Sequence, residues 1–251
     1  GEYKLMGLAP YGDPESLQTK EFVKKIKEHL ITVFDDGGIF LHQSYFNYAV
    51  GLRMANDGKW ESLFGFKRRA EEEEELQQHH CNLALAIQQV TEEIVLKLAA
   101  HAQQITGAKK LCLAGGVALN CVANGKLQNS GLFDAIYIQP AGGDAGGAAG
   151  AAWAAYHLFK EQSRTIQLPD GMNGSYLGPS FTNDEILHTA ESFHANFQLF
   201  IDEAALNTTV ATLLNEGNVV GWFQGSMEYG PRALGNRSIL ADARNAAMQK
   251  K

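Results

Sequence analysis

The stretch "KKLCLAGGVALNCVANGKLQNSGLFDAIYIQPAGGDAGG", residues 109–147, decides the fold. A short apolar run ends in two glycines, and a helical stretch that ends at Gly131 follows it. A second apolar run, AIYIQP, leads into a glycine-rich turn and an alanine-rich stretch with high helix propensity. Strand, glycine loop and helix, twice in succession, are typical of an open sheet with parallel strands. The sequence therefore predicts an α/β fold with both glycine loops at the carboxyl ends of strands, where such sheets bind ligands.

Upstream of this stretch the apolar spacing predicts a long helix that ends near Gly107. The residues that recur every three or four positions are Leu83, Ile87, Val90, Ile94 and Leu98. Near its start, His79 and His80 are neighbours in sequence, and neighbouring helical side chains diverge. We therefore do not expect a metal-binding histidine pair there.

The first 80 residues carry weaker signals. Residues 1–16 contain glycine and proline and are predicted to form a loop, and residues 17–30 an amphipathic helix. "TVFDDGGIFLH" is typical of a hairpin. The charged run "KRRAEEEEE" is interpreted as a solvated face or the start of a helix.

A polar break at residues 163–180 predicts a boundary between two domains, residues 1–165 and residues 171–251. Thr182 and Glu185 then form the sequence signature of a capping box at the start of a helix. "FQLFI" and "NVVGWF" are predicted strands on either side of a helix over residues 202–217, and "SILAD" is a further strand. This second domain is therefore also expected to be α/β.

An arginine-bearing stretch, "GWFQGSMEYGPRALGNRSILAD" (residues 221–242), follows in that domain. Arg232 and Arg237 each offer a planar fork to phosphate or carboxylate oxygens, and Glu228 could pair with one of them and orient it. A solvated surface loop is the alternative interpretation. The flanking apolar strands favour a binding loop for an anionic, planar group.

The two glycine loops suggest a nucleotide site. Gly115 and Gly116 would let a phosphate approach the backbone, and Asn120 could add a polar side chain. Asp144, between two glycine pairs, could reach a bound cation or merely cap the next helix. Either loop alone could be a simple turn, but two at one sheet edge favour a cleft for a nucleotide and a metal ion.

Composition excludes several classes of protein. The formal net charge of −7 argues against a broad nucleic-acid-binding face. No apolar run approaches the ~20 residues that span a bilayer, so no membrane segment is expected. The three cysteines lack metal-ligand spacing and are interpreted as buried free thiols in a reducing compartment, which predicts a cytoplasmic protein.

Four segments together resemble one family: "KLMGLAPYG", "LAGGVALNCVANGKL", "IYIQPAGGDAGGAAGAAW" and "GWFQGSMEYGPRALGNRSILADAR". They are similar, in order and spacing, to the O-carbamoyltransferases of the nodulation and antibiotic-tailoring type. The resemblance implies the second half of an actin-like (ribonuclease-H-like) ATPase domain, followed by the start of a YrdC-like α/β domain. It also implies an enzyme that forms a carbamoyl adenylate from carbamoyl phosphate and ATP and passes the carbamoyl group to a hydroxyl of a small metabolite.

The resemblance also implies roles for particular residues. A divalent metal, iron or magnesium, would be held by Asp144. Arg232, Asn236 and Arg237 would lie at the catalytic centre. The nucleotide would contact the following residues: Lys4, Gly115, Gly116, Asn120, Gly142, Gly143 and Gly146.

The sequence also departs from the family pattern. Ser226 stands where members often have arginine, and the family's metal-binding histidines would lie upstream of Gly1. These departures predict an internal fragment that is inactive alone. An actin-like sugar or acetate kinase and a non-catalytic nucleotide-binding fragment are the competing hypotheses, and the sequence indicates neither the acceptor nor the oligomeric state.

Overall fold

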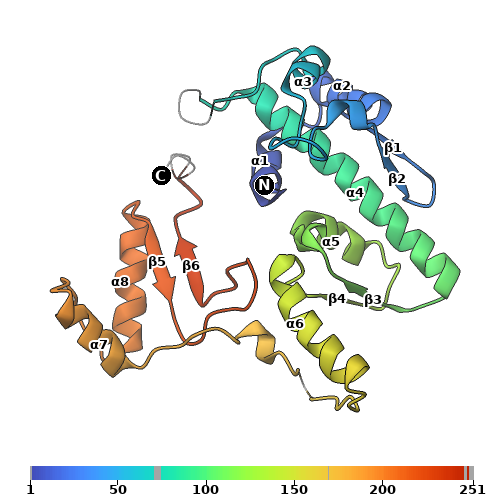
Figure 1. The fold of residues 1–251 in the computed structure, drawn as a ribbon. Helices are drawn as coiled ribbons and strands as arrows, with labels where there is room; N and C mark the ends of the chain where they lie inside the picture. Colours follow the sequence, from blue (N-terminus) through green and yellow to red (C-terminus); the bar gives the residue numbers. More distant parts are fainter. Residues whose placement is uncertain (1, 71–74, 169, 246–247, 249–251) are drawn as a thin grey trace. The chain divides into compact units, whose positions relative to one another are not determined.

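The structure, a computed structural model, describes residues 2–70, 75–168, 170–245 and 248. It consists of two compact units, Gly1–Gln139 and Pro140–Lys251 (Figure 1). The units divide earlier in the chain than the predicted polar break at residues 163–180, so the second glycine loop belongs to the second unit. Within the second unit, Tyr229 hydrogen-bonds this loop and Gly230 packs closely against Pro140 at its start.

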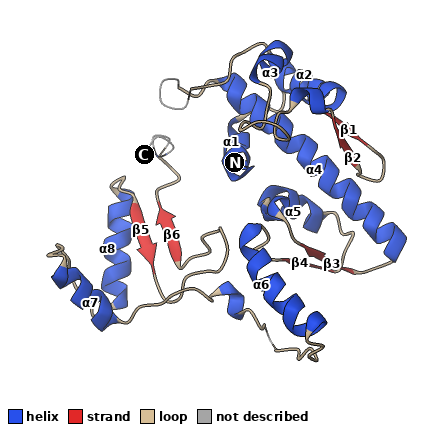
Figure 2. Cartoon of the chain, in the orientation of Figure 1, coloured by secondary structure: helices blue, strands red, loops and turns tan. Residues whose placement is uncertain are grey.

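The first unit is mixed α/β, with a long helix beside two small sheets (Figure 2). Its helices and strands are α1 (Glu2–Leu8), α2 (Leu17–Lys25), β1 (Ile31–Val33), β2 (Ile39–Leu41), α3 (Asp57–Phe64), α4 (Gln78–Thr106), β3 (Lys110–Leu113), α5 (Cys121–Asn129) and β4 (Ala135–Ile138). A π-helical turn, Ile26–Leu30, extends α2 as far as the predicted helix reached. The hairpin is confirmed, since β1 and β2 pair antiparallel.

Helix α4 organises this unit because both apolar clusters pack on it. One cluster has Phe22, Phe64 and Val90 among its buried members, and the other contains Ala99, Leu127 and Phe133. The helix ends as predicted at Gly107, which adopts the left-handed conformation with φ 62°. The predicted apolar stripe of α4 is confirmed at Leu83, Ile87, Val90 and Ile94, which belong to the first cluster, but it is wrong for Leu98, which is exposed.

The prediction of a loop over residues 1–16 is wrong for its first half, where α1 forms. Pro10 and Gly12 suggested a loop, but both lie just beyond this helix. Pro10 occupies the start of a 3-10 turn, where a missing N–H costs nothing. A Cβ on Gly12 would lie 2.6 Å from Leu85 Cβ and 2.7 Å from the Cys81 carbonyl oxygen, so this glycine lets the chain lie against α4.

The predicted strand–helix–strand unit is confirmed. β3 and β4 pair in parallel, with Leu111 opposite Ile136 and Leu113 opposite Ile138. One face of this pair packs on α4 and α5 through Leu111, Leu113 and Ile136. The other face leaves Cys112 and Tyr137 exposed, so the prediction of buried thiols holds for Cys81 alone, and all three cysteines are free.

The second unit contains α6 (Asp144–Ala154), α7 (Asn183–Ser192), α8 (Glu203–Asn215), β5 (Val220–Phe223) and β6 (Arg237–Leu240). The capping box of α7 is confirmed, since the Thr182 and Glu185 side chains each bond the other's backbone N–H. The predicted strand "FQLFI" is wrong. Phe197, Leu199 and Ile201 alternate as a strand would, but none of the described residues pairs with them, and β5 pairs with β6 instead.

The expectation that His79 and His80 diverge is also wrong. Their ring centroids lie 4.1 Å apart. His80 Nδ1 accepts a hydrogen bond from the Gln77 backbone N–H, which turns its ring back over the start of α4. The described residues nevertheless contain no group of three or more His, Cys, Asp or Glu that could hold a metal ion. Within the same residues, every helix is too short or too polar to cross a membrane.

Candidate functional site

The first glycine turn joins β3 to α5 in the first unit. Gly115 adopts φ +100°, which disfavours residues with a Cβ, and a 3-10 turn over Gly116–Leu119 leads to α5. A Cβ on Gly115 would meet no atom within 4 Å, so the space above this backbone is open. The turn therefore offers a ligand close access to the main chain at the carboxyl end of β3.

Asn120 forms the N-cap of α5. Its Oδ1 accepts hydrogen bonds from the Ala123 N–H (3.1 Å) and from Gln88 Nε2 (3.1 Å). Its Nδ2 donates to Gln88 Oε1 at 2.8 Å. The side-chain amide predicted to face a nucleotide is thus engaged by the protein, and it fixes the start of α5 against α4.

A buried chain of polar groups continues from Asn120 into α4. Gln88 Nε2 also donates to Glu92 Oε1 at 2.8 Å, and Lys126 of α5 forms an ion pair with Glu92 Oε2. Gln88 and Glu92 are both buried. An amide pair between residues 88 and 120 has no local signature in the sequence, so this network could not be predicted.

Lys4 lies on α1 and is exposed. Its helix runs beside the start of α5, where Met6 Sδ lies 3.8 Å from Cys121 Sγ. The structure therefore brings the helix that bears Lys4 next to the element that follows the first glycine turn.

The second glycine turn opens α6 in the second unit. Gly143 is the N-cap, and Asp144 lies in the first helical turn with an exposed side chain. None of the described residues forms a hydrogen bond or ion pair with the Asp144 carboxylate, so the alternative of a capping aspartate is wrong. Gly146 is required by packing, because a Cβ there would overlap the Ala141 carbonyl oxygen.

The arginine loop between β5 and β6 is built around Glu228. This side chain is 4% exposed, and its Oε1 accepts hydrogen bonds from the backbone N–H groups of Leu234 (2.7 Å) and Asn236 (2.9 Å). Its Oε2 lies 3.3 Å from Arg237 Nε. Burial acts to raise the pKa of Glu228, but hydrogen bonds from the backbone amides of Asn236, Glu228 itself and Leu234, together with the Arg237 charge, outweigh it and leave the pKa lowered.

Arg237 faces inward, as expected if Glu228 orients an arginine. Its Nη2 donates to the carbonyl oxygens of Gly230 and Arg232, the latter at 3.4 Å. Asn236 is also engaged, since its Nδ2 donates to the Ser226 carbonyl oxygen at 2.7 Å. Both side chains therefore hold the loop in shape, and the partly buried Arg232 lies on the segment they brace.

The arginine loop and the second glycine turn meet within the second unit. Tyr229 Oη donates to the carbonyl oxygen of Ala145. Gly230 has φ +132°, and a Cβ there would lie 2.5 Å from the Pro140 carbonyl oxygen. Ser175 fixes the loop from its other side, because Ser175 Oγ donates to the Tyr229 carbonyl at 2.6 Å. Within the second unit, the arginine loop therefore packs against the second glycine turn.

Comparison with known proteins gives two family matches in chain order. Residues 1–153 match the carbamoyltransferase N-terminus, and residues 211–251 match the carbamoyltransferase C-terminus. An uncharacterized protein of Synechocystis sp. is 50% identical over 99% of this chain and 39% of its own length. The nodulation protein NolO of Bradyrhizobium diazoefficiens is 40% identical over 98% of this chain and 40% of its own length.

A relative with a named reaction is also similar. The 3'-hydroxymethylcephem-O-carbamoyltransferase of Streptomyces clavuligerus is 32% identical over 68% of this chain and 30% of its own length. The chain thus spans about two fifths of the length of the first two relatives.

Proposed function

Because the chain belongs to the carbamoyltransferase family, we propose that the protein moves a carbamoyl group from carbamoyl phosphate to a hydroxyl of a small metabolite, with ATP as activator. The observation that carries this proposal is the arginine loop, braced by Glu228 and packed on a glycine turn at a helix N-terminus. The relative named for carbamoyl transfer to a hydroxymethyl group supports a hydroxyl as acceptor.

The chemistry needs an activated carbamoyl group, because a carbamate carbonyl is a poor electrophile. In the proposed reaction carbamoyl phosphate loses phosphate to water, and an oxygen of the resulting carbamate attacks the α-phosphorus of ATP. Pyrophosphate leaves, and the product is a carbamoyl adenylate. The acceptor hydroxyl then attacks the carbonyl carbon, AMP leaves, and the hydroxyl proton passes to a base.

We assign Arg232 to the phosphate oxygens, where a guanidinium stabilises developing negative charge. Arg237 and Asn236 hold the loop that bears Arg232, through the contacts described above. Lys4 and the backbone at Gly115 and Gly116 would contact the nucleotide within the first unit, with Asn120 positioning that turn.

In the second unit, Gly142, Gly143 and Gly146 would line the approach to the start of α6. A Cβ on Gly143 would meet no atom within 4 Å, which leaves this backbone open to a ligand. The helix N-terminus there offers amide donors to phosphate oxygens.

The described residues do not form a complete site for the divalent metal expected from the family. Asp144 supplies one exposed carboxylate, and no group of three metal-binding side chains surrounds it in the part of the chain that the structure describes. We therefore derive no step through the metal. We also propose the actin-like and YrdC-like folds for the two domains, 1–165 and 171–251, and a cytoplasmic location.

The test is exchange of labelled pyrophosphate into ATP by the full-length protein. We expect exchange that depends on carbamoyl phosphate. Arg232→Gln should lower it by about 100-fold, the effect of removing one donor to a developing anion. Arg164→Gln, an exposed arginine outside the loop, is the matched control and should leave exchange unchanged.

Product analysis separates this proposal from the kinase alternative. AMP and pyrophosphate are expected from carbamoyl adenylate formation, whereas a kinase would release ADP. Release of ADP, or nucleotide binding without exchange in the full-length protein, would contradict the proposed reaction.

A further inference from the structure

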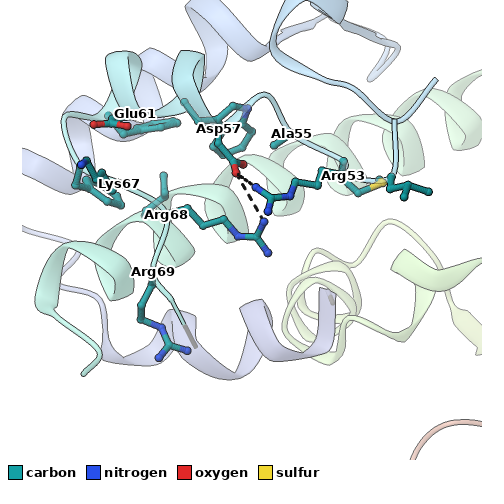
Figure 3. A pocket seen from close by; sticks show the side chains of 13 residues that line it. Arg53, Ala55, Asp57, Glu61, Lys67, Arg68 and Arg69 are labelled. Atoms are coloured by element: carbon teal, nitrogen blue, oxygen red, sulfur yellow. Dashed lines mark hydrogen bonds and ion pairs between the residues drawn. The ribbon is translucent and has the colours of Figure 1, made fainter. Parts of the chain in front are cut away.

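The segment between β2 and α4 forms a pocket of about 470 Å³ in the first unit (Figure 3). Its size lies within the range of small-molecule sites. None of its lining residues is among those proposed above for carbamoyl transfer.

The walls of the pocket are fixed by hydrogen bonds that involve the main chain. The Asn47 N–H donates to the Met54 carbonyl (2.8 Å), and the Asn56 N–H donates to the Tyr45 carbonyl (3.0 Å). Trp60 Nε1 donates to the same Tyr45 carbonyl at 2.9 Å, which ties α3 to this loop. The pocket is therefore preformed.

The floor of the pocket is aromatic. Trp60, Phe64 and Phe66 line it, with ring centroids 5.4 Å apart for Trp60 and Phe64 and 6.5 Å apart for Phe64 and Phe66. These rings are continuous with the apolar core around Phe22, which holds them in place. Leu52 and Met54 at the pocket's edge are exposed, so apolar surface extends toward solvent.

The mouth of the pocket is cationic in a chain whose formal net charge is −7. Arg53 and Arg68 point toward one carboxylate, that of Asp57 (Figure 3). Arg53 Nη1 lies 2.5 Å from Asp57 Oδ2, while Arg68 Nη1 lies 3.8 Å from the same oxygen. Four cations line the pocket against two carboxylates, so its lining retains positive charge. The cations are Arg53, Lys67, Arg68 and Arg69, and the carboxylates are those of Asp57 and Glu61.

We propose that this pocket binds a small anionic molecule with an apolar or aromatic body. The body would contact Trp60, Phe64 and Phe66, and its carboxylate, sulfonate or phosphate would meet Arg68 and Arg53. A purely solvated arginine cluster needs no aromatic floor beneath it, and a purely apolar pocket needs no guanidinium groups at its mouth. Together, the two features fit an amphiphilic anion better than a neutral or cationic ligand.

The test uses 8-anilinonaphthalene-1-sulfonate and its uncharged analogue N-phenyl-1-naphthylamine as probes. The full chain carries Trp153→Phe and Trp222→Phe, so Trp60 is the remaining tryptophan and donates excitation energy to a bound probe. We expect saturable energy transfer with the sulfonate, and binding of the neutral analogue about tenfold weaker, the effect of one charge-assisted contact.

Two variants distinguish binding in this pocket from nonspecific attraction of the sulfonate probe to surface cations. Arg68→Gln should weaken sulfonate binding about tenfold and leave the neutral analogue unaffected. Lys24→Gln is the matched control, because Lys24 is exposed, also has a carboxylate at 3.8 Å (Glu28) and does not line the pocket. Equal affinity for both probes, no saturable transfer from Trp60, or an equal loss in Lys24→Gln would overturn the proposal.

Discussion

The two units of this chain are held together by different kinds of interaction. The first unit contains both of the apolar clusters found among the described residues, and long helix α4 contributes to each. The buried residues of the second unit, among those described, are Ala141, Met172, Ser175 and Glu228. Its arginine loop is shaped by hydrogen bonds to a buried carboxylate and by close backbone packing at glycine.

The two units therefore differ in which kind of substitution should destabilise them. The first unit packs through two apolar clusters, and it also buries the polar side chains of Gln88 and Glu92. In the second unit, Glu228 engages the backbone amides of Leu234 and Asn236 and the side chain of Arg237, and these contacts fix the shape of the arginine loop. Among the described residues, the arginine loop of the second unit is held mainly by polar contacts, so substitutions should affect the two units in different ways.

The largest expected effect is loss of core packing in the first unit. Phe22 is 2% exposed and packs edge-on against Phe64, with ring centroids 5.4 Å apart. Phe22→Ala should lower the free energy of unfolding of this unit by about 4 kcal/mol, since it removes the ring and leaves a cavity. Guanidinium denaturation measures it by Trp60 fluorescence in a background of Trp153→Phe and Trp222→Phe. The Trp222 transition of the second unit, followed in a background of Trp60→Phe and Trp153→Phe, should not move.

The control for this change is Leu17→Ala on the same helix, where the side chain is 84% exposed and the cost should be below about 0.5 kcal/mol. An equal shift of both tryptophan transitions in Phe22→Ala would show that the two units unfold together. It would contradict the view that each unit is stabilised by its own interactions.

A smaller effect is expected where backbone packing shapes the second unit. Gly230→Ala would force a Cβ to within 2.5 Å of the Pro140 carbonyl at a φ of +132°. We expect a loss of about 3 kcal/mol, since both the contact and the backbone conformation are unfavourable. Thermal unfolding followed by Trp222 fluorescence tests it. Gly143→Ala, with open space around the Cβ, should cost far less, and similar losses in the two variants would contradict the packing shown here.

A still smaller effect is expected for the buried carboxylate. Glu228→Gln keeps an oxygen for the Leu234 and Asn236 amides but removes the charge that faces Arg237. The expected loss is about 2 kcal/mol, the cost of weakening a buried, charge-assisted set of hydrogen bonds. Chemical denaturation followed by Trp222 fluorescence measures it, and Glu203→Gln on the exposed surface of α8 serves as control.

The same carboxylate predicts a pH dependence. The pKa of Glu228 is lowered in the folded state, so its stabilisation is fully present above the unfolded pKa of about 4.3. It is lost as the pH falls through the lower folded pKa, because protonation removes the charge that Arg237 and the amides stabilise. Stability measured from pH 6 to pH 3 should therefore fall less steeply in Glu228→Gln than in the parent. Parallel curves would show that Glu228 titrates normally.

Local patterns in the sequence predicted the elements that depend on local physics. The stripe of α4, the hairpin, the parallel pair β3–β4 and the capping box of α7 all follow from spacing and turn chemistry. The strand predicted at residues 197–201 failed because a strand needs a hydrogen-bonded neighbour, which its own alternation cannot reveal. Helix α1 was missed because the adjoining Gly12 serves close packing on Leu85, a contact 73 positions away in sequence.

The contacts of the candidate site also separate into local pairs, which the sequence predicts, and long-range pairs, which it does not. Glu228 and Arg237 could be paired from sequence because they share one short loop between two predicted strands. The Asn120–Gln88 pair could not, since it joins two elements through side chains that are unremarkable where they stand. The contact between Tyr229 and Ala145 could not be predicted either, because the two residues lie 84 positions apart in sequence. The contacts of the site that depend on tertiary structure, and not on neighbours in the chain, therefore could not be predicted from the sequence.

The smallest effect concerns a helix outside either cluster. Thr182 Oγ1 accepts a hydrogen bond from the Glu185 N–H at 3.3 Å, and the Glu185 carboxylate accepts one from the Thr182 N–H at 2.7 Å. Thr182→Ala should cost about 1 kcal/mol, whereas Thr182→Ser should cost little because the hydroxyl is retained. Amide hydrogen exchange over Asn183–Ser192 measures the change in local opening. If Thr182→Ala and Thr182→Ser protect these amides equally, α7 does not depend on its cap. Other contacts would then hold it, and the second unit would owe less to polar interactions than the contrast with the first unit implies.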